Sequence, residues 1–128
     1  MSAKERPLSP FMIGPYYRAQ LTSVLSISHR ITGVALCILL IPLLLAWLAS
    51  AAGGEESYLA FQGLFDHALM KLAVLVILFS LWFHLLNGIR HLFWDIGRGL
   101  EIGSAYTSGW LVVAGSLIGT AVMAGVLL

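Results

Sequence analysis

Three long apolar runs set the main constraint on how this chain can fold. They cover about residues 31–52, 69–93 and 109–128. Each is close to the ~20 residues that a helix needs to cross the hydrocarbon core of a membrane. The whole chain is 59% hydrophobic and only 10% charged, whereas about a quarter of the residues of a soluble domain are charged. We therefore expect an all-α membrane protein with three transmembrane helices, forming a single domain over residues 1–128.

The distribution of basic residues predicts the orientation in the membrane. Residues 53–70, between the first two spans, contain no Lys or Arg. The basic residues on the other side of the spans are Lys4, Arg6, Arg18, Arg30, Arg90 and Arg98. Because inner loops are enriched in Lys and Arg, we expect residues 1–30 on the inner side, with the N-terminus inside and the C-terminus outside. This suits a bacterial inner (cytoplasmic) membrane, with the mitochondrial inner membrane as the alternative.

Several function classes have no support in the sequence. The net charge of +1 provides no basic field for nucleic acid, so we expect no nucleic-acid partner. The run Gly97-Arg98-Gly99 follows a predicted helix and not a strand, so we interpret it as a turn and not as a dinucleotide-binding motif. Cys37 is the one cysteine, which excludes an internal disulfide. It lies in an apolar run, where we expect it to serve as a small packing residue.

A stripe of histidines follows one face of the second span. On a helix, His84, Gly88, His91 and Asp95 lie on one face. His84 is about ten residues from the inner end, or roughly 15 Å deep at 1.5 Å per residue. A histidine at that depth needs a functional or structural reason. It could ligate haem iron, with Gly88 leaving room for a porphyrin, or it could form a hydrogen bond to a neighbouring helix without any metal.

A second cluster of polar residues precedes the first apolar run. Ser26 and Arg30 share a helix face if the helix begins by Thr22 or Ser23, either of which can serve as an N-cap. A hydroxyl and a guanidinium at the inner interface could hold a quinone carbonyl or an anionic head group. The alternative for Arg30 is a simple positive-inside anchor. His29 lies about 100° around the helix from Arg30 and could reach a different group, such as a haem propionate.

Smaller features lead to further expectations. Pro42 can kink the first helix, and the pairs Gly115/Gly119 and Ala121/Gly125 have a spacing that allows close helix packing. We expect Asn87 to bridge helices or to hold a water molecule, and Asp95 to pair with Arg90 or Arg98. His67 is interpreted as a solvated loop residue. The tryptophans that we expect near span ends are Trp47, Trp94 and Trp110.

Two motifs together carry a resemblance to a known family. They are Arg6-Pro7-Leu8-Ser9-Pro10 followed by Thr22-Ser23 and Ser26-Ile27-Ser28-His29-Arg30-Ile31-Thr32-Gly33, and His84-x-x-x-Gly88-Ile89-Arg90-His91-Leu92-x-Trp94-Asp95-x-Gly97. Their order, their spacing and the three-span layout resemble the cytochrome b subunit of succinate dehydrogenase, the membrane anchor of complex II.

This resemblance implies a helical anchor bundle that a second small membrane subunit completes. The anchor would hold a flavoprotein and an iron–sulfur subunit, where succinate is oxidised, and electrons would pass to ubiquinone. One haem b would lie between the two anchor subunits. By resemblance His84 is the axial ligand of the haem iron, and Ser26 and Arg30 belong to the quinone site. His29, Arg30 and His91 would lie near the haem propionates, and this chain contains no catalytic residue of its own.

Three alternatives stay open at this point. The chain could be the anchor of a fumarate reductase, which runs the reaction in the reverse direction. It could be a haem-free structural anchor whose histidines only pack. It could also be a small carrier of protons or metal ions, which the lack of carboxylates inside the spans disfavours.

Overall fold

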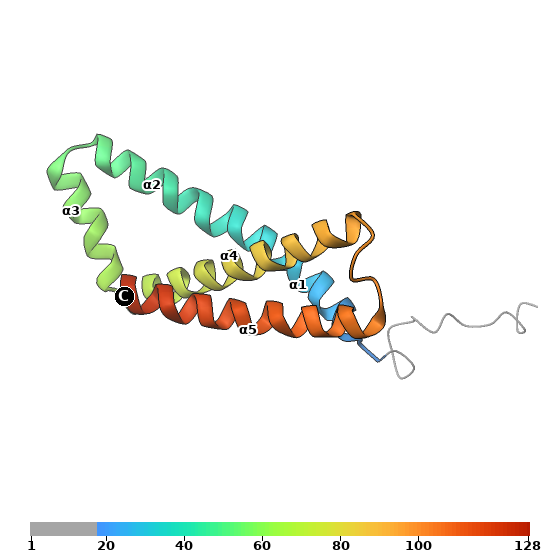
Figure 1. Ribbon diagram of the computed structural model, residues 1–128. Helices are drawn as coiled ribbons and strands as arrows, with labels where there is room; N and C mark the ends of the chain where they lie inside the picture. The colour runs from blue at the N-terminus through green and yellow to red at the C-terminus, as the bar shows by residue number, and fades with distance from the viewer. Residues whose placement is uncertain (1–17) are drawn as a thin grey trace, which may run out of the picture.

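The computed structural model describes residues 18–128, and the predicted contact of residues 6–10 with an iron–sulfur subunit lies outside this part. The described chain is helical and contains no strand. Its elements in order are α1 (Leu21–Ala35), the π-helical segment η2 (Leu36–Leu40), α2 (Ile41–Ala52), α3 (Glu55–Gly63), the 3₁₀ segment η3 (Leu64–Asp66), α4 (Ala68–Asp95) and α5 (Ile102–Leu127) (Figure 1). The expected all-α architecture is confirmed.

Three continuous helical stretches are long and apolar enough to cross a membrane. They run over Leu21–Ala52, Ala68–Asp95 and Ile102–Leu127, with 32, 28 and 26 residues. All three begin before the apolar runs of the sequence, because a change in polarity marks the edge of the hydrocarbon layer and not the end of a helix. The segment that carries Ser26 and Arg30 therefore belongs to the first long helix. Trp110 lies two turns inside α5, at the point where the apolar run of residues 109–128 begins, and its place near the end of a span stays a prediction.

A widened turn, and not the expected kink, is what precedes Pro42 in the first long helix. The helix widens to a π-turn over Leu36–Leu40, just before the proline. Proline has no N–H to donate and its ring crowds the carbonyl four residues earlier, and a wide turn accommodates both defects. Beyond this point α2 contacts η2 and α3, but neither α4 nor α5 within the described chain. Figure 1 shows α2 leading away from the α4–α5 pair and α3 returning to it.

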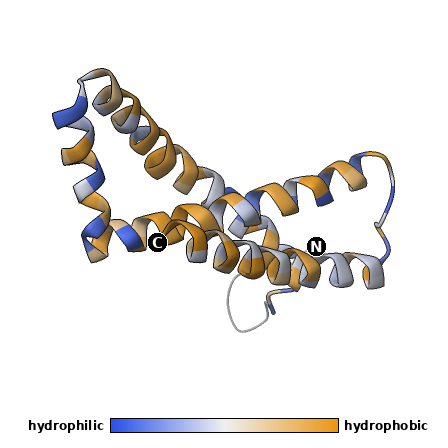
Figure 2. Ribbon diagram, turned by 60° about the vertical axis from the view of Figure 1, so that its left-hand side comes forward, coloured by the Kyte–Doolittle hydropathy of each residue, from blue (hydrophilic) through white to orange (hydrophobic). Residues whose placement is uncertain are grey.

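The exposed surface of the spans is mainly apolar. Figure 2 shows mainly hydrophobic residues along α2, α4 and α5, while hydrophilic residues gather on α3 and near the α4–α5 loop, and many large apolar side chains of these three helices are exposed. A helix that is apolar all round belongs in a lipid or protein environment. Cys37 lies exposed in η2, so the expected packing role is wrong within this chain. His67 is also exposed, in the link between η3 and α4, as expected.

One buried residue from each long helix forms the core. Leu25 of α1, Phe83 of α4 and Val112 of α5 pack together at the end of the bundle where α1 begins. The two central glycines of α5 bring that helix close to α4. An added Cβ at Gly119 would lie 2.5 Å from Trp82 Cδ2, and one at Gly115 would lie 2.8 Å from Leu86 Cδ1. This glycine pair therefore packs inside the chain.

Gly125 lies on the same helix but has nothing within 4 Å of an added Cβ. This provides a matched pair for a stability test. Gly119→Ala forces a methyl group into the indole of Trp82, and we expect it to destabilise the fold by about 1–3 kcal/mol, as overpacking does. Gly125→Ala meets open space and should leave stability unchanged or slightly raised. Thermal unfolding in detergent measures both, and equal midpoints for the two variants would contradict the packing.

A buried arginine links α4 to α5. Arg90 is only 5% exposed and donates hydrogen bonds to Ser108 Oγ (3.0 Å), Ala105 O (2.9 Å) and Asn87 Oδ1 (3.2 Å). Asn87 is fully buried and also donates to Leu25 O at 3.5 Å, so it bridges α4 to α1 as expected. Partners of this kind are what an ionisable group at membrane depth requires.

The predicted ion pair of Asp95 with Arg90 is wrong. The Arg90 guanidinium faces α5 and lies 3.9 Å from the centre of the Trp94 ring, whereas Asp95 is exposed at the end of α4. Within residues 18–128 Asp95 makes no hydrogen bond through its side chain. The spacing of charges along the sequence suggested the pair, but the hydroxyl and carbonyl acceptors of α5 satisfy the arginine instead.

The turn between α4 and α5 is built on glycine. Gly97 and Gly99 both have φ of 75°, a left-handed conformation that other residues rarely adopt. Trp94 Nε1 donates a hydrogen bond to Gly99 O at 3.0 Å and closes the turn. The interpretation of residues 97–99 as a turn is confirmed, and Arg98 projects from it beside the bundle.

Candidate functional site

The site begins with two stacked histidines, one from α1 and one from α4. The rings of His29 and His84 lie 3.9 Å apart between centroids and are nearly parallel, with 10° between their planes. The ring of His91, two turns after His84, lies 5.3 Å from that of His29. The structure therefore brings together all three histidines that the sequence singled out. Each of them is half-buried.

The contacts of His84 determine which of its nitrogens carries the proton. His84 Nδ1 lies 3.0 Å from the backbone carbonyl oxygen of His29. A carbonyl can only accept, so Nδ1 carries the hydrogen and donates it. Thr32 Oγ1 lies 3.3 Å from the same nitrogen and donates its own proton to His29 O at 2.9 Å, so it can accept from Nδ1 as well. The lone pair of His84 is therefore on Nε2.

Small residues allow α1 and α4 to approach each other at this point. An added Cβ at Gly33 would lie 2.9 Å from His84 Cε1, which is closer than real Cβ atoms come to other atoms. Gly88 faces the other histidine, and an added Cβ would lie 3.8 Å from His29 Cε1. The sequence interpretation placed a porphyrin next to Gly88. In the described chain it is His29 that lies beside this glycine.

One polar atom of the histidine cluster is unsatisfied. His29 Nδ1 is buried and has no hydrogen-bond partner in the part of the chain that the structure describes. A buried polar group without a partner costs about 1–3 kcal/mol. Such an atom at a cluster of this kind indicates that a group from outside residues 18–128 belongs nearby.

Ser26 and Arg30 lie one turn apart on α1. The helix begins at Leu21, and its N-cap is Gln20, which makes no side-chain capping bond. The predicted capping role of Thr22 or Ser23 is therefore wrong. The prediction that Ser26 and Arg30 share a helix face does not depend on the cap, because α1 begins before both residues. Arg30 is exposed. It lines a shallow groove of about 250 Å³ whose other lining residues are Ile27, Ile31 and Val34.

Two residues that hold His84 were not assigned by sequence reasoning. Thr32 and Gly33 both contact its ring, and each lies three or four residues after His29. That spacing placed them on the face of α1 that carries His29. Nothing in the sequence said that this face meets His84, because the contact depends on how α1 crosses α4.

Comparison with known proteins identifies the family. Residues 2–123 match the succinate dehydrogenase/fumarate reductase transmembrane subunits. The chain belongs to this family. The succinate dehydrogenase cytochrome b556 subunit of Rickettsia felis is 39% identical over 114 residues, which cover 89% of this chain and 86% of the relative. The b556 subunit of Paracoccus denitrificans is 38% identical over 113 residues, or 88% and 85% of the two chains.

A mitochondrial relative extends the comparison. The human mitochondrial succinate dehydrogenase cytochrome b560 subunit is 38% identical over 119 residues, covering 84% of this chain and 63% of the relative. The resemblance drawn from the two motifs is thus confirmed at the level of the family. The three apolar helices fit a transmembrane subunit. Among the described residues no three His, Cys, Asp or Glu side chains cluster as they would to hold a metal ion.

Proposed function

We propose that this chain is a membrane-anchor subunit of a succinate:quinone oxidoreductase, that it ligates a b-type haem through His84 and that it forms part of the site where ubiquinone is reduced. The single observation that carries the proposal is the hydrogen bond from His84 Nδ1 to His29 O at 3.0 Å. It orients the imidazole and leaves the lone pair on Nε2, which is then available to a metal ion. The family relatives named as cytochrome b subunits support the haem.

The residues around His84 fit haem ligation. Ligating histidines nearly always donate their second nitrogen to a carbonyl or carboxylate, which orients the ring and raises the basicity of the ligand. His84 makes this bond to the backbone oxygen of His29, with Thr32 Oγ1 as a second acceptor. A bound haem supplies an electron carrier between the helices of the anchor. Since one histidine among residues 18–128 is held in this way, a second ligand of the haem iron would come from the partner anchor subunit.

His29 and His91 suit the acidic edge of the same cofactor. Both lie on the side of His84 toward the basic end of the bundle, and His29 Nδ1 lacks a partner among residues 18–128. A propionate nearby would satisfy an imidazole nitrogen that this chain leaves unsatisfied. Arg30 would add a positive charge at the same end. Charge-assisted hydrogen bonds of this kind are about twice as strong as neutral ones.

The groove beside Arg30 supports a quinone site. Its lining is apolar apart from the guanidinium, and this matches a quinone, whose head accepts hydrogen bonds while its tail stays in lipid. Ser26, one turn earlier on α1, adds a hydroxyl. A fixed positive charge stabilises the negative charge that develops on the oxygens as the ring is reduced. The charged end of the helix is also where a soluble iron–sulfur subunit can deliver electrons.

The proposal includes partners and an orientation. The soluble partners are a flavoprotein, which oxidises succinate, and an iron–sulfur subunit, and a second small anchor subunit would pack on the exposed apolar faces. The end of the bundle with Arg30 and Arg98 would face the cytoplasm in bacteria or the matrix in mitochondria, following the positive-inside rule. The relatives named above are succinate dehydrogenase subunits, which favours succinate oxidation over fumarate reduction.

The test is purification of the full-length tagged chain from its own membranes in a mild detergent. We expect three other subunits to co-purify, and a dithionite-reduced minus oxidised spectrum of the complex to contain a b-type haem band. Succinate should reduce ubiquinone in the same preparation. A complete but colourless complex would favour the haem-free anchor and overturn the cytochrome assignment. A chain that purifies alone and binds divalent metal would instead favour the small carrier.

A further inference from the structure

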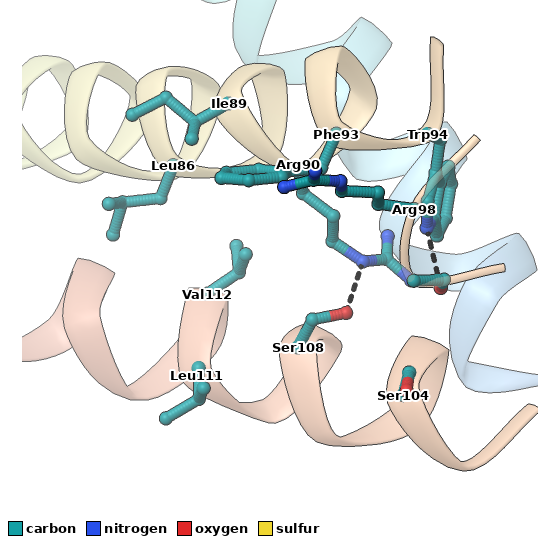
Figure 3. A pocket seen from close by; sticks show the side chains of 11 residues that line it. Leu86, Ile89, Arg90, Phe93, Trp94, Arg98, Ser104, Ser108, Leu111 and Val112 are labelled. Carbon is teal, nitrogen blue, oxygen red and sulfur yellow. Dashed lines mark hydrogen bonds between the residues drawn. The ribbon is translucent and has the colours of Figure 1, made fainter. Parts of the chain in front are cut away.

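A groove on the far side of α4 from the histidines is not used by the proposed function. It lies between α4 and α5 at the basic end of the bundle and has a volume of about 320 Å³. We call it the α4–α5 groove. Its polar lining residues are Arg90, Arg98, Ser104 and Ser108, and its apolar ones include Ile89, Phe93 and Leu111 (Figure 3).

The position of the groove separates it from the haem and quinone sites. On α4, residues 86, 89 and 93 lie roughly 140–200° around the helix from His84 at 100° per residue. His84 faces α1, where it contacts His29, whereas the groove faces α5. The groove beside Arg30 has entirely different lining residues, all on α1. A ligand of the α4–α5 groove would therefore touch neither the histidine cluster nor Arg30.

The groove has a charged end and an apolar end. Arg98 projects from the glycine turn, and Figure 3 shows its side chain reaching back over the groove. Arg90 lies beneath, held by Ser108. No Asp or Glu is among the residues that line the groove in the described chain. Toward the middle of the bundle the lining is apolar and faces outward, with Leu111 67% exposed and Phe93 52% exposed.

From this arrangement we infer that the α4–α5 groove binds an anionic phospholipid of the leaflet at the basic end. The phosphate would lie at Arg98, with the hydroxyl of Ser104 close by, and an acyl chain would follow Phe93 and Leu111 toward the membrane centre. Two guanidinium groups without a lining carboxylate select a net negative head group. The exposed apolar half selects a ligand with a hydrocarbon chain over a free anion. The turn that closes with Trp94 and Gly99 orders the backbone from which Arg98 projects.

The test uses the intact purified complex and native mass spectrometry. Delipidated complex is titrated with phosphatidylglycerol and with phosphatidylcholine of the same acyl chains, and the affinity of the tightest-held lipid is measured. We expect Arg98→Gln to weaken phosphatidylglycerol binding about fivefold, since one basic residue near a membrane contributes about 1 kcal/mol. Binding of phosphatidylcholine should not change. Lys71→Gln removes the same charge at the other end of α4 and should affect neither lipid.

A second matched pair tests the apolar half of the groove. Leu111→Trp fills it and should reduce retention of the tight lipid, whereas Leu117→Trp, at a 57% exposed position of α5 that does not line the groove, should not. Inorganic phosphate added in excess should leave the lipid bound. Equal affinities for wild type and Arg98→Gln, equal losses in Arg98→Gln and Lys71→Gln, or displacement by inorganic phosphate would each overturn the lipid site.

Discussion

Replacing His84 with alanine should remove or alter the b-type haem band of the complex while the subunits remain associated. The mutation deletes the one imidazole whose Nδ1 is bonded to a backbone carbonyl, and with it the proposed axial ligand. Loss of partners that only orient a ligand already lowers metal affinity by about 10–100-fold, so loss of the ligand itself should have a larger effect. The measurement is the reduced-minus-oxidised optical spectrum of variant and wild type at equal subunit content.

The stacked pair of histidines requires a second variant. The ring of His29 lies 3.9 Å from that of His84, so its unsatisfied imidazole can replace the lost ligand after a small shift. A band that persists with a changed position in His84→Ala should therefore disappear in the double variant His29→Ala/His84→Ala. His67→Ala, at an exposed position in the link before α4, is the matched control and should have a wild-type spectrum. An unchanged band in the double variant would mean that this chain does not ligate the haem.

Apolar periodicity and length were enough to predict the three long helices. The pattern of charged residues was a poorer guide to the helix boundaries, since α1 begins ten residues before the first apolar run. The short helix α3 was not predicted, because residues 53–70 were interpreted only as an outer loop. The π-turn at Leu36–Leu40 could be anticipated from Pro42 as a disturbance, but its form could not. Such a turn depends on how the backbone redistributes one lost hydrogen bond.

In the histidine site, too, the sequence predicted the contacts within one helix but not those between helices. Helical spacing predicted that His84, Gly88 and His91 share a face, and the motif order connected them with residues 26–30. The stack of His29 on His84 could not be predicted, because it requires the crossing of α1 and α4 that Gly33 permits. The interaction partners of Arg90 were predicted wrongly for the same reason. Its partners Ala105 and Ser108 lie on a different helix, and pairwise spacing along α4 contains no information about them.

Replacing Arg30 with leucine should impair quinone reduction far more than succinate oxidation. Of the described residues that line the apolar groove on α1, Arg30 alone is charged, and a hydrogen bond from a charged group contributes about 1.5–3 kcal/mol. We therefore expect the rate of ubiquinone reduction to fall by roughly 10–100-fold. Reduction of an artificial acceptor that takes electrons from the soluble subunits should stay at the wild-type rate. Arg30→Lys retains the charge but not the planar fork and should give an intermediate rate.

The control is Arg18→Leu, which removes the same charge at an exposed position just before α1 and should leave both activities unchanged. Ser26→Ala should raise the KM for quinone more than it lowers kcat, because a neutral hydroxyl contributes to binding more than to the developing charge. If Arg30→Leu lowered both activities equally, with fewer soluble subunits bound, the guanidinium would serve assembly at the basic end of the bundle. The quinone would then have to be bound elsewhere in the complex, since among residues 18–128 no other charged side chain lines the groove on α1.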